Sequence, residues 1–190
     1  GVYLALTGAR IKGPDCLALG LATHYIAADA LSDVKAAITA NPADLAKLLD
    51  DAARDAPPAD ITADLLRINA LFASDRLEDI ISALRADDSE WAAKQLETLL
   101  SKSPQTCKVT LRQLAEGAQM TDFADQMAQE YAIGARVVVM HDFIEGVRAL
   151  IIDKDHSPKW KPATAEEVSD EWINAIFAPL PENERWTPLG

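Results

Sequence analysis

The strongest constraint on the fold is the repeated occurrence of helix-start signals along the chain. Two of the expected helices open with a cap residue followed at once by proline, Asn41-Pro42 and Ser103-Pro104, which places an N-cap side chain before a proline at the first helical position. Ser74 and Ser89 are further cap candidates. Alanine is abundant and runs of β-branched or aromatic residues are scarce, which favours helix over strand. These signals predict a chain of successive short helices.

We therefore expect a mainly α fold with at most one or two short strands. The best strand candidate is residues 21–26, and the clearest loop is DAPPAD at residues 55–60. Hydrophobic residues at helical spacing, such as Leu77, Ile80, Ile81 and Leu84, predict a buried helix face. The expected helices are residues 1–8, 14–19, 31–39, 42–53, 61–72, 75–84, 89–100, 104–116, 121–140 and 169–177.

Length and charge limit the classes of function. The 190 residues are enough for a proper hydrophobic core in one or two domains. The net charge of −12 argues against nucleic acid and anionic membrane surfaces as partners, and no apolar run approaches the length of a membrane span. Cys16 and Cys107 lie far apart without a CxxC neighbour, so we expect two free thiols in a reducing compartment.

One stretch stands out in this acidic chain: residues 145–162, EGVRALIIDKDHSPKWKP. Phe143, Val147, Leu150 and Ile151 follow helical spacing and form one apolar face at its start. Helix is expected to end before residues 153–161, because prolines at positions 158 and 162 disfavour helix in the residues that precede them. Three lysines then alternate with acidic and aromatic residues.

Three blocks of sequence resemble one protein family. Residues 142–162, DFIEGVRALIIDKDHSPKWKP, are similar to the C-terminal signature of the 3-hydroxyisobutyryl-CoA hydrolases, a branch of the crotonase (enoyl-CoA hydratase/isomerase) superfamily. Residues 6–22, LTGARIKGPDCLALGLA, resemble the crotonase helix-turn-helix after the catalytic strand, and residues 23–26 resemble the short strand that follows it. Residues 103–117, SPQTCKVTLRQLAEG, resemble a TLRQL helix of the same hydrolases.

The resemblance implies the C-terminal helical portion of a crotonase-like fold. It divides the chain into the end of the crotonase core at residues 1–26, a helical insertion typical of the hydrolase branch at 27–102, and a C-terminal helical region at 103–190 that carries the signature. Helical periodicity begins at Val2 without a cap residue before it. We therefore expect the chain to be part of a longer protein and to begin inside a helix.

The parts that carry catalysis in this superfamily are not found in the sequence. The family holds a thioester oxygen with two backbone N–H groups, one of them at a helix N-terminus behind a Gly-rich turn, which is a sound way to stabilise an oxyanion. In the hydrolase branch a Glu and an Asp on a PET…PDVGG-like segment do the acid–base or nucleophilic work. Neither the Gly-rich turn nor that segment occurs here. We expect no catalytic residue in this chain and place the catalytic segments upstream of Gly1.

The acids and histidines present predict no second catalytic site. Glu145 either orients a loop or simply forms an ion pair with Arg148 or Arg112, and the second interpretation is favoured. His141 and Asp142 are adjacent, so they do not face each other on a helix as a dyad would. The three histidines share no ligand spacing, so no metal site is expected. No bound cofactor is expected either, with coenzyme A entering only as part of the substrate.

Lys154, Lys159 and Lys161, together with Trp160, form the candidate binding site. Coenzyme A carries a 3′-phosphate and a pyrophosphate, lysine is a point-charge partner for phosphate, and an indole can pack against adenine. The resemblance adds that C-terminal helices of crotonases lie near the nucleotide. The alternative is a structural turn, in which Lys154 pairs with Asp153 or Asp155 and Trp160 fills a gap between helices.

Three hypotheses for function follow. The first is part of a 3-hydroxyisobutyryl-CoA hydrolase-like enzyme of valine breakdown, acting on a short-chain hydroxyacyl-CoA. The second is an enoyl-CoA hydratase or isomerase of the same superfamily. The third is an inactive helical module that self-associates through apolar helix faces. No targeting segment is visible, so we expect a cytoplasmic protein of bacterial type, or one of the mitochondrial matrix if the source is eukaryotic.

Overall fold

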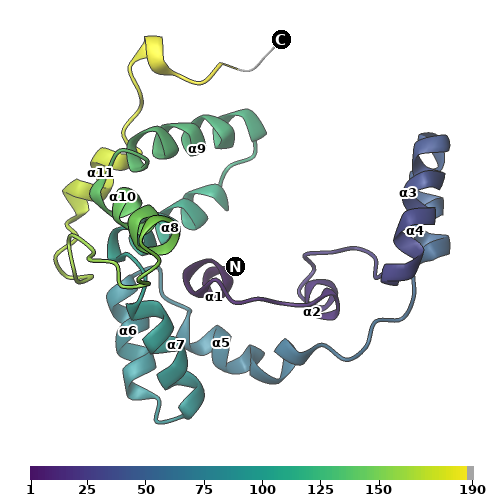
Figure 1. The fold of residues 1–190 in the computed structure, drawn as a ribbon, viewed down its shortest axis with the longest axis horizontal. Helices are drawn as coiled ribbons and strands as arrows, with labels where there is room; N and C mark the ends of the chain where they lie inside the picture. Colours follow the sequence, from purple (N-terminus) through teal and green to yellow (C-terminus); the bar gives the residue numbers. More distant parts are fainter. Residues whose placement is uncertain (188–190) are drawn as a thin grey trace. The chain divides into compact units, whose positions relative to one another are not determined.

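The computed structural model describes residues 1–187, and all the regular elements in this range are helical (Figure 1). The α-helices are α1 Val2–Thr7, α2 Gly13–Ala18, α3 Leu31–Ala40, α4 Leu45–Ala52, α5 Leu65–Leu71, α6 Leu77–Ala86, α7 Glu90–Leu100, α8 Pro104–Gly117, α9 Phe123–Val137, α10 His141–Val147 and α11 Asp170–Phe177. Single turns of 3₁₀ helix occur at Ala28–Ala30, Pro42–Asp44, Asp60–Asp64 and Glu182–Glu184, and a π-helical turn, η4, at Arg148–Ile152.

The expected fold class needs a correction, because residues 1–187 contain no β-strand. The strand expected at residues 21–26 is wrong. A strand requires a ladder of backbone hydrogen bonds to a neighbouring strand. This segment has one bond of that kind, from the N–H of Arg54 to the carbonyl of Tyr25 at 2.8 Å, while the N–H groups of Leu21 and Ala22 donate to Cys16 at the end of α2.

Helix starts follow the sequence signals at most places. The hydroxyl oxygens of Ser89 and Ser103 accept hydrogen bonds from backbone N–H groups in the first turns of α7 and α8, as N-cap side chains do. Gly8 ends α1 in the left-handed conformation, with φ of 66°. Asn41 and Ser74 differ from expectation. No side-chain cap bond is found at Asn41, where a 3₁₀ turn precedes α4, and the N-cap position of α6 is Arg76 instead of Ser74.

The structure divides into two compact units, which we describe separately. The first comprises Gly1–Ala9 with Ala70–Gly190, of which the last three residues lie outside the described range. Its main core gathers side chains of α1, α6, α7 and α8, with Ile80 and Leu84 almost completely buried. The helices α6 and α7 lie side by side (Figure 1). The expected face at Leu77, Ile80, Ile81 and Leu84 is the buried face of α6.

A second core cluster in the same unit joins α8, α9 and α11. Val109 from α8, Ile133 from α9 and Ile173 from α11 are buried together with Ile176 and Val168. The long helix α8 therefore contributes to both clusters, with Cys107 and Leu111 in one and Val109 in the other. This shared helix fixes the positions of α1, α6 and α7 relative to α9 and α11.

The second unit, Arg10–Asn69, contains α2 to α4 and has few buried side chains. The most buried side chain of this unit is that of Asp15, which is 4% exposed. The carboxylate of Asp15 accepts hydrogen bonds from the N–H groups of Lys12 and Ile61, each at 3.0 Å, and these bonds lower its pKa. Asp15 thus joins α2 to the 3₁₀ turn at Asp60–Asp64.

Within the described residues, we find no helix that is both long and apolar enough to cross a membrane. The three segments expected from the family resemblance remain a prediction, since they concern a longer protein.

Candidate functional site

The signature stretch begins as helix and ends as an irregular segment, as the sequence predicts. Helix α10 continues into the π-helical turn η4, which ends at Ile152. Residues 153–162, which we call the lysine segment, contain no regular element. The apolar face expected at Phe143, Val147, Leu150 and Ile151 is real, because all four side chains line one groove.

The lysine segment opens with a strained turn. Lys154 and His156 adopt φ values of 55° and 53°, in the left-handed region that residues with a Cβ rarely occupy. Each such residue costs roughly 1–2 kcal/mol. The guanidinium of Arg148 donates hydrogen bonds to Asp153 at 2.7 Å and Asp155 at 2.6 Å, on either side of Lys154. These bonds hold the turn closed and lower the pKa of Asp155. The pKa of Arg148 is raised by its hydrogen bond to Glu145 first and then by those to Asp155 and Asp153.

Glu145 connects this turn to the rest of the segment. Its side chain is only 11% exposed and forms a bidentate pair with Arg148, with both N–O distances at 2.8 Å. The same carboxylate accepts the backbone N–H of Lys159 at 2.7 Å. The hydrogen bonds from Arg148 and from Lys159 lower the pKa of Glu145 to about 2. Glu145 therefore forms the ion pair favoured from the sequence and also fixes a loop.

Asp142 and His141 hold the next part of the segment. Asp142 is 4% exposed, accepts the N–H of Lys161 at 2.8 Å and also accepts the hydroxyl of Ser103 at the start of α8. The Nε2 atom of His141 lies 2.9 Å from the carbonyl of Lys159, to which it donates. Sequence reasoning missed both roles. No local signal could have found them, since the partners are 18 and 19 residues apart.

The predicted site residues all lie in the lysine segment, but the three lysines and Trp160 differ in how far they are buried. Lys154, Lys159 and Lys161 are exposed. Trp160 is half-buried: its indole N–H donates to the carbonyl of Ser101 at 3.0 Å, and its ring packs beside Gly146. The pairing of Lys154 with Asp153 or Asp155, considered from the sequence, is not observed, because both carboxylates bind Arg148.

An apolar groove of about 470 Å³ lies beside the lysine segment. Leu6 of α1, Thr106 and Thr110 of α8 and the apolar face of α10 form its walls, and Trp160 lies at its edge. Leu150 and Ile151 remain more than half exposed there. The groove has the size of small-molecule sites in proteins. Trp160, the residue between Lys159 and Lys161, is one of the residues that line it.

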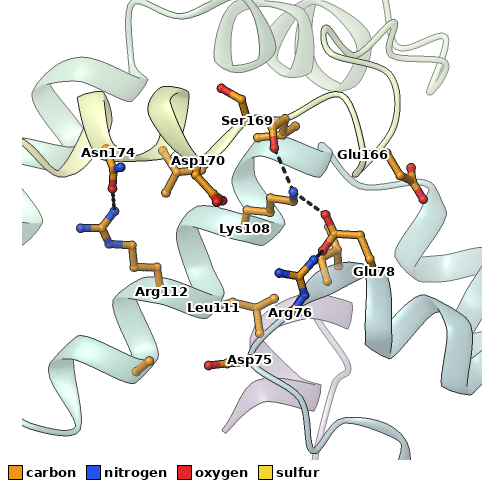
Figure 2. A pocket seen from close by; sticks show the side chains of 14 residues that line it. Asp75, Arg76, Glu78, Lys108, Leu111, Arg112, Glu166, Ser169, Asp170 and Asn174 are labelled. Atoms are coloured by element: carbon orange, nitrogen blue, oxygen red, sulfur yellow. Dashed lines mark hydrogen bonds and ion pairs between the residues drawn. The ribbon is translucent and has the colours of Figure 1, made fainter.

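A second, more polar pocket of about 600 Å³ lies between α6, α8 and α11 (Figure 2). Its cations are already bound within the protein. Lys108, only 15% exposed, pairs with Glu78 and donates to the carbonyl of Val168 at 2.9 Å. Arg112 donates to Asn174 at 2.7 Å, as Figure 2 shows, and to Glu116 at 2.6 Å. These bonds tie helices together, so we assign the pocket a structural role.

Further chemistry is limited in the described part of the chain. Residues 1–187 contain no group of three or more His, Cys, Asp or Glu side chains that could hold a metal ion. Both cysteines are free thiols. Burial raises the pKa of Cys107 to about 11, so its thiol is a poor nucleophile near neutral pH. Binding at the lysine segment stays a prediction from the sequence.

Comparison with known proteins identifies the family. Residues 1–177 match the family model described as enoyl-CoA hydratase/isomerase. The chain belongs to the enoyl-CoA hydratase/isomerase family. This agrees with the crotonase-superfamily resemblance of the three sequence blocks, and the match covers the groove and the lysine segment.

Relatives within this family point to one branch. The chain is 41% identical over 193 residues to the mitochondrial 3-hydroxyisobutyryl-CoA hydrolase of Gallus gallus, covering 97% of this chain and 50% of that protein. It is 38% identical over 189 residues to the corresponding protein of Homo sapiens, covering 95% and 49%. The chain thus spans about half the length of the curated relatives it matches.

Solved structures of the family share the fold of this chain. The crystal structure of an enoyl-CoA hydratase from Rhodobacter sphaeroides 2.4.1 superimposes with a TM-score of 0.85 at 31% identity, covering 98% of this chain and 53% of that one. The crystal structure of a carnitinyl-CoA dehydratase from Mycobacterium thermoresistibile gives 0.84 at 31% identity, covering 95% and 52%. The helical arrangement described above is therefore common to members with different named reactions.

Proposed function

We propose that this chain is part of an acyl-CoA thioester hydrolase of the 3-hydroxyisobutyryl-CoA hydrolase type. The observation that carries the proposal is the similarity to hydrolases of that name along almost the whole chain, at 41% identity for the Gallus gallus protein. The whole protein then cleaves a short hydroxyacyl-CoA of valine breakdown. In this proposal, its acid–base and oxyanion-binding groups lie outside the 190 residues of this chain.

In this proposal the lysine segment supplies part of the coenzyme A site. Lys154, Lys159 and Lys161 provide exposed positive charge for the phosphate groups. Trp160 contributes through the part of its ring that lines the groove, since its ring nitrogen is already bound to Ser101. Support comes from Arg148, which binds the neighbouring carboxylates of Asp153 and Asp155 and so reduces their competition for the lysines.

A second candidate function is hydration or dehydration of an acyl-CoA. It is favoured by the structural likeness to an enoyl-CoA hydratase and a carnitinyl-CoA dehydratase, with TM-scores of 0.85 and 0.84. Both candidates bind an acyl-CoA and differ in the reaction. A third, an inactive self-associating module, rests on exposed apolar residues such as Ile144 and Ile152.

The test of the reaction is a pair of assays on the full-length protein. One measures free thiol released from 3-hydroxyisobutyryl-CoA, and the other measures hydration of a short 2-enoyl-CoA by loss of its conjugated absorbance. The proposal expects thiol release with little hydration. Hydration without thiol release would favour the second candidate, and neither reaction together with a stable oligomer would favour the third.

A further inference from the structure

Residues 159–161 of the lysine segment bind α10 in the hydrogen-bond pattern of an extended backbone. The N–H and the carbonyl of Lys159 both point toward this helix, where they meet Glu145 at 2.7 Å and His141 at 2.9 Å. The N–H of Lys161 points the same way, to Asp142 at 2.8 Å. In an extended chain the N–H and carbonyl of one residue share a side, and this side recurs at every second residue. Residues 159–161 show this pattern.

An extended backbone fixes where the side chains go. Successive side chains point to opposite faces, so those of Lys159 and Lys161 lie on one face and that of Trp160 on the other. The structure agrees, since Trp160 packs beside Gly146 and bonds to Ser101 while both lysines are exposed. In such a chain the Cα atoms of residues two positions apart, such as Lys159 and Lys161, are about 7 Å from each other. We therefore expect the two exposed lysine side chains to leave the segment on the same side, with the ammonium of Lys159 donating to the hydroxyl of Ser157 at 3.3 Å.

The carboxylates that hold the segment are themselves fixed. Asp142 is 4% exposed and is bound by Ser103 at the N-cap of α8. Glu145 is bound on both oxygens by Arg148, which also closes the left-handed turn through Asp153 and Asp155. A side chain held by such bonds can determine the geometry of a site that it does not itself touch.

We propose that Glu145 and Asp142 are positioning residues, whose bonds to the N–H groups of Lys159 and Lys161 align the two lysine side chains to grip a ligand with more than one phosphate group. The inference rests on the proposed function, because coenzyme A is the ligand concerned. It goes further in assigning a role to two carboxylates that would themselves repel the phosphates. Loss of either carboxylate lets the segment fray and separates the two cations.

The test measures how strongly the chain distinguishes coenzyme A from 3′-dephospho-coenzyme A by calorimetry. A merely structural role would change thermal stability and leave this ratio of dissociation constants unchanged. For the unsubstituted chain we expect a ratio of about ten, which corresponds to about 1.4 kcal/mol. Glu145→Ala and Asp142→Ala should each reduce the ratio below about three, and Glu145→Gln, which retains an acceptor oxygen, should keep part of it.

Glu116→Ala is the matched control, because Glu116 also pairs with an arginine on its own helix and makes no bond to the lysine segment. This variant should retain the full ratio. Amide hydrogen exchange at Lys159 and Lys161 gives a second readout that needs no ligand, and Glu145→Ala should accelerate it at Lys159 at least about tenfold.

The outcomes separate the two proposals. A full ratio in Glu145→Ala and Asp142→Ala, or unchanged exchange at Lys159 in Glu145→Ala, would overturn the positioning role and leave coenzyme A binding intact. If the unsubstituted chain binds coenzyme A and 3′-dephospho-coenzyme A equally well, both the phosphate site and the positioning role of the two carboxylates would be overturned. Loss of the ratio in Glu116→Ala as well would show that the effect is general destabilisation.

Discussion

At the scale of single residues, Glu145 determines more of the candidate site than any lysine does. It connects Arg148, which holds the strained turn, to the backbone of Lys159. Its pKa is lowered to about 2 from an ordinary value of 4.5 by the bonds from Arg148 and Lys159. A carboxyl group whose folded pKa is depressed stabilises the fold fully above its unfolded pKa and loses that contribution as the pH falls through the folded pKa.

This shift predicts an acid-dependent contribution to stability. The difference in free energy of unfolding between the unsubstituted chain and Glu145→Gln should be constant above about pH 5 and should shrink between about pH 4.5 and pH 2. Urea unfolding at several pH values measures it. A difference that stays constant down to pH 2 would contradict the ionised pair with Arg148.

The residues also show what sequence could predict about the site. The lysines and Trp160 were predicted as a site because a local cluster of cations is unusual in an acidic chain, and this stays a prediction. The ion pair of Glu145 with Arg148 was one of two pairings considered from the sequence, whereas the additional pairing of Arg148 with Asp153 and Asp155 was not expected. The role of Asp142 depends on the segment folding back over 19 residues, which no local pattern encodes.

At the scale of elements, the caps join local helix formation to the candidate site. Ser103 accepts the N–H of Thr106 as the cap of α8 and donates to the buried Asp142. Ser89 caps α7 in the same way, accepting the N–H of Ala92. The two caps therefore differ mainly in the additional bond that Ser103 makes.

Comparison of the two caps isolates that bond. Ser89→Ala should lower the free energy of unfolding by about 1 kcal/mol, as loss of an N-cap typically does. Ser103→Ala should cost about 2–4 kcal/mol, because a buried carboxylate also loses a hydrogen bond. Thermal or urea unfolding of both variants provides the measurement. Equal costs would show that the bond to Asp142 contributes nothing to stability.

Elements were predictable where their cause is local. The caps at Ser89 and Ser103 and the apolar face of α6 depend on residues within one or two turns, and the structure confirms them. The strand expected at residues 21–26 was wrong because strand formation depends on a partner, and its hydrophobic residues alone could not supply one.

At the scale of the whole chain, the two units differ in how much they bury. Ile80 and Leu84 in the first unit are almost completely inaccessible, while α3 and α4 in the second contain no buried residue. Few buried apolar contacts imply a low free energy of local opening. The family membership, carried by sequence blocks along the chain, was predictable. The division at Ala9 and Ala70 was not.

This difference predicts two levels of protection from hydrogen exchange. Backbone amides of α3 and α4 should exchange at least about a hundredfold faster than those of α6 and α8 at neutral pH. Exchange followed by mass spectrometry of peptic peptides measures both sets in one sample. Equal protection of α4 and α6 would contradict the weaker packing of the second unit.

The proposed role of the lysine segment depends on its contact with the phosphates of coenzyme A. The measurement that tests this claim most directly is calorimetric titration of the 190-residue chain with coenzyme A, with Lys159→Ala/Lys161→Ala beside it. Lys35→Ala/Lys94→Ala removes the same charge from exposed positions elsewhere and serves as control. We predict binding that weakens at least about tenfold in the first variant and less than about twofold in the control. Equal affinity of both variants, or no binding to the unsubstituted chain at millimolar coenzyme A, would contradict the claim.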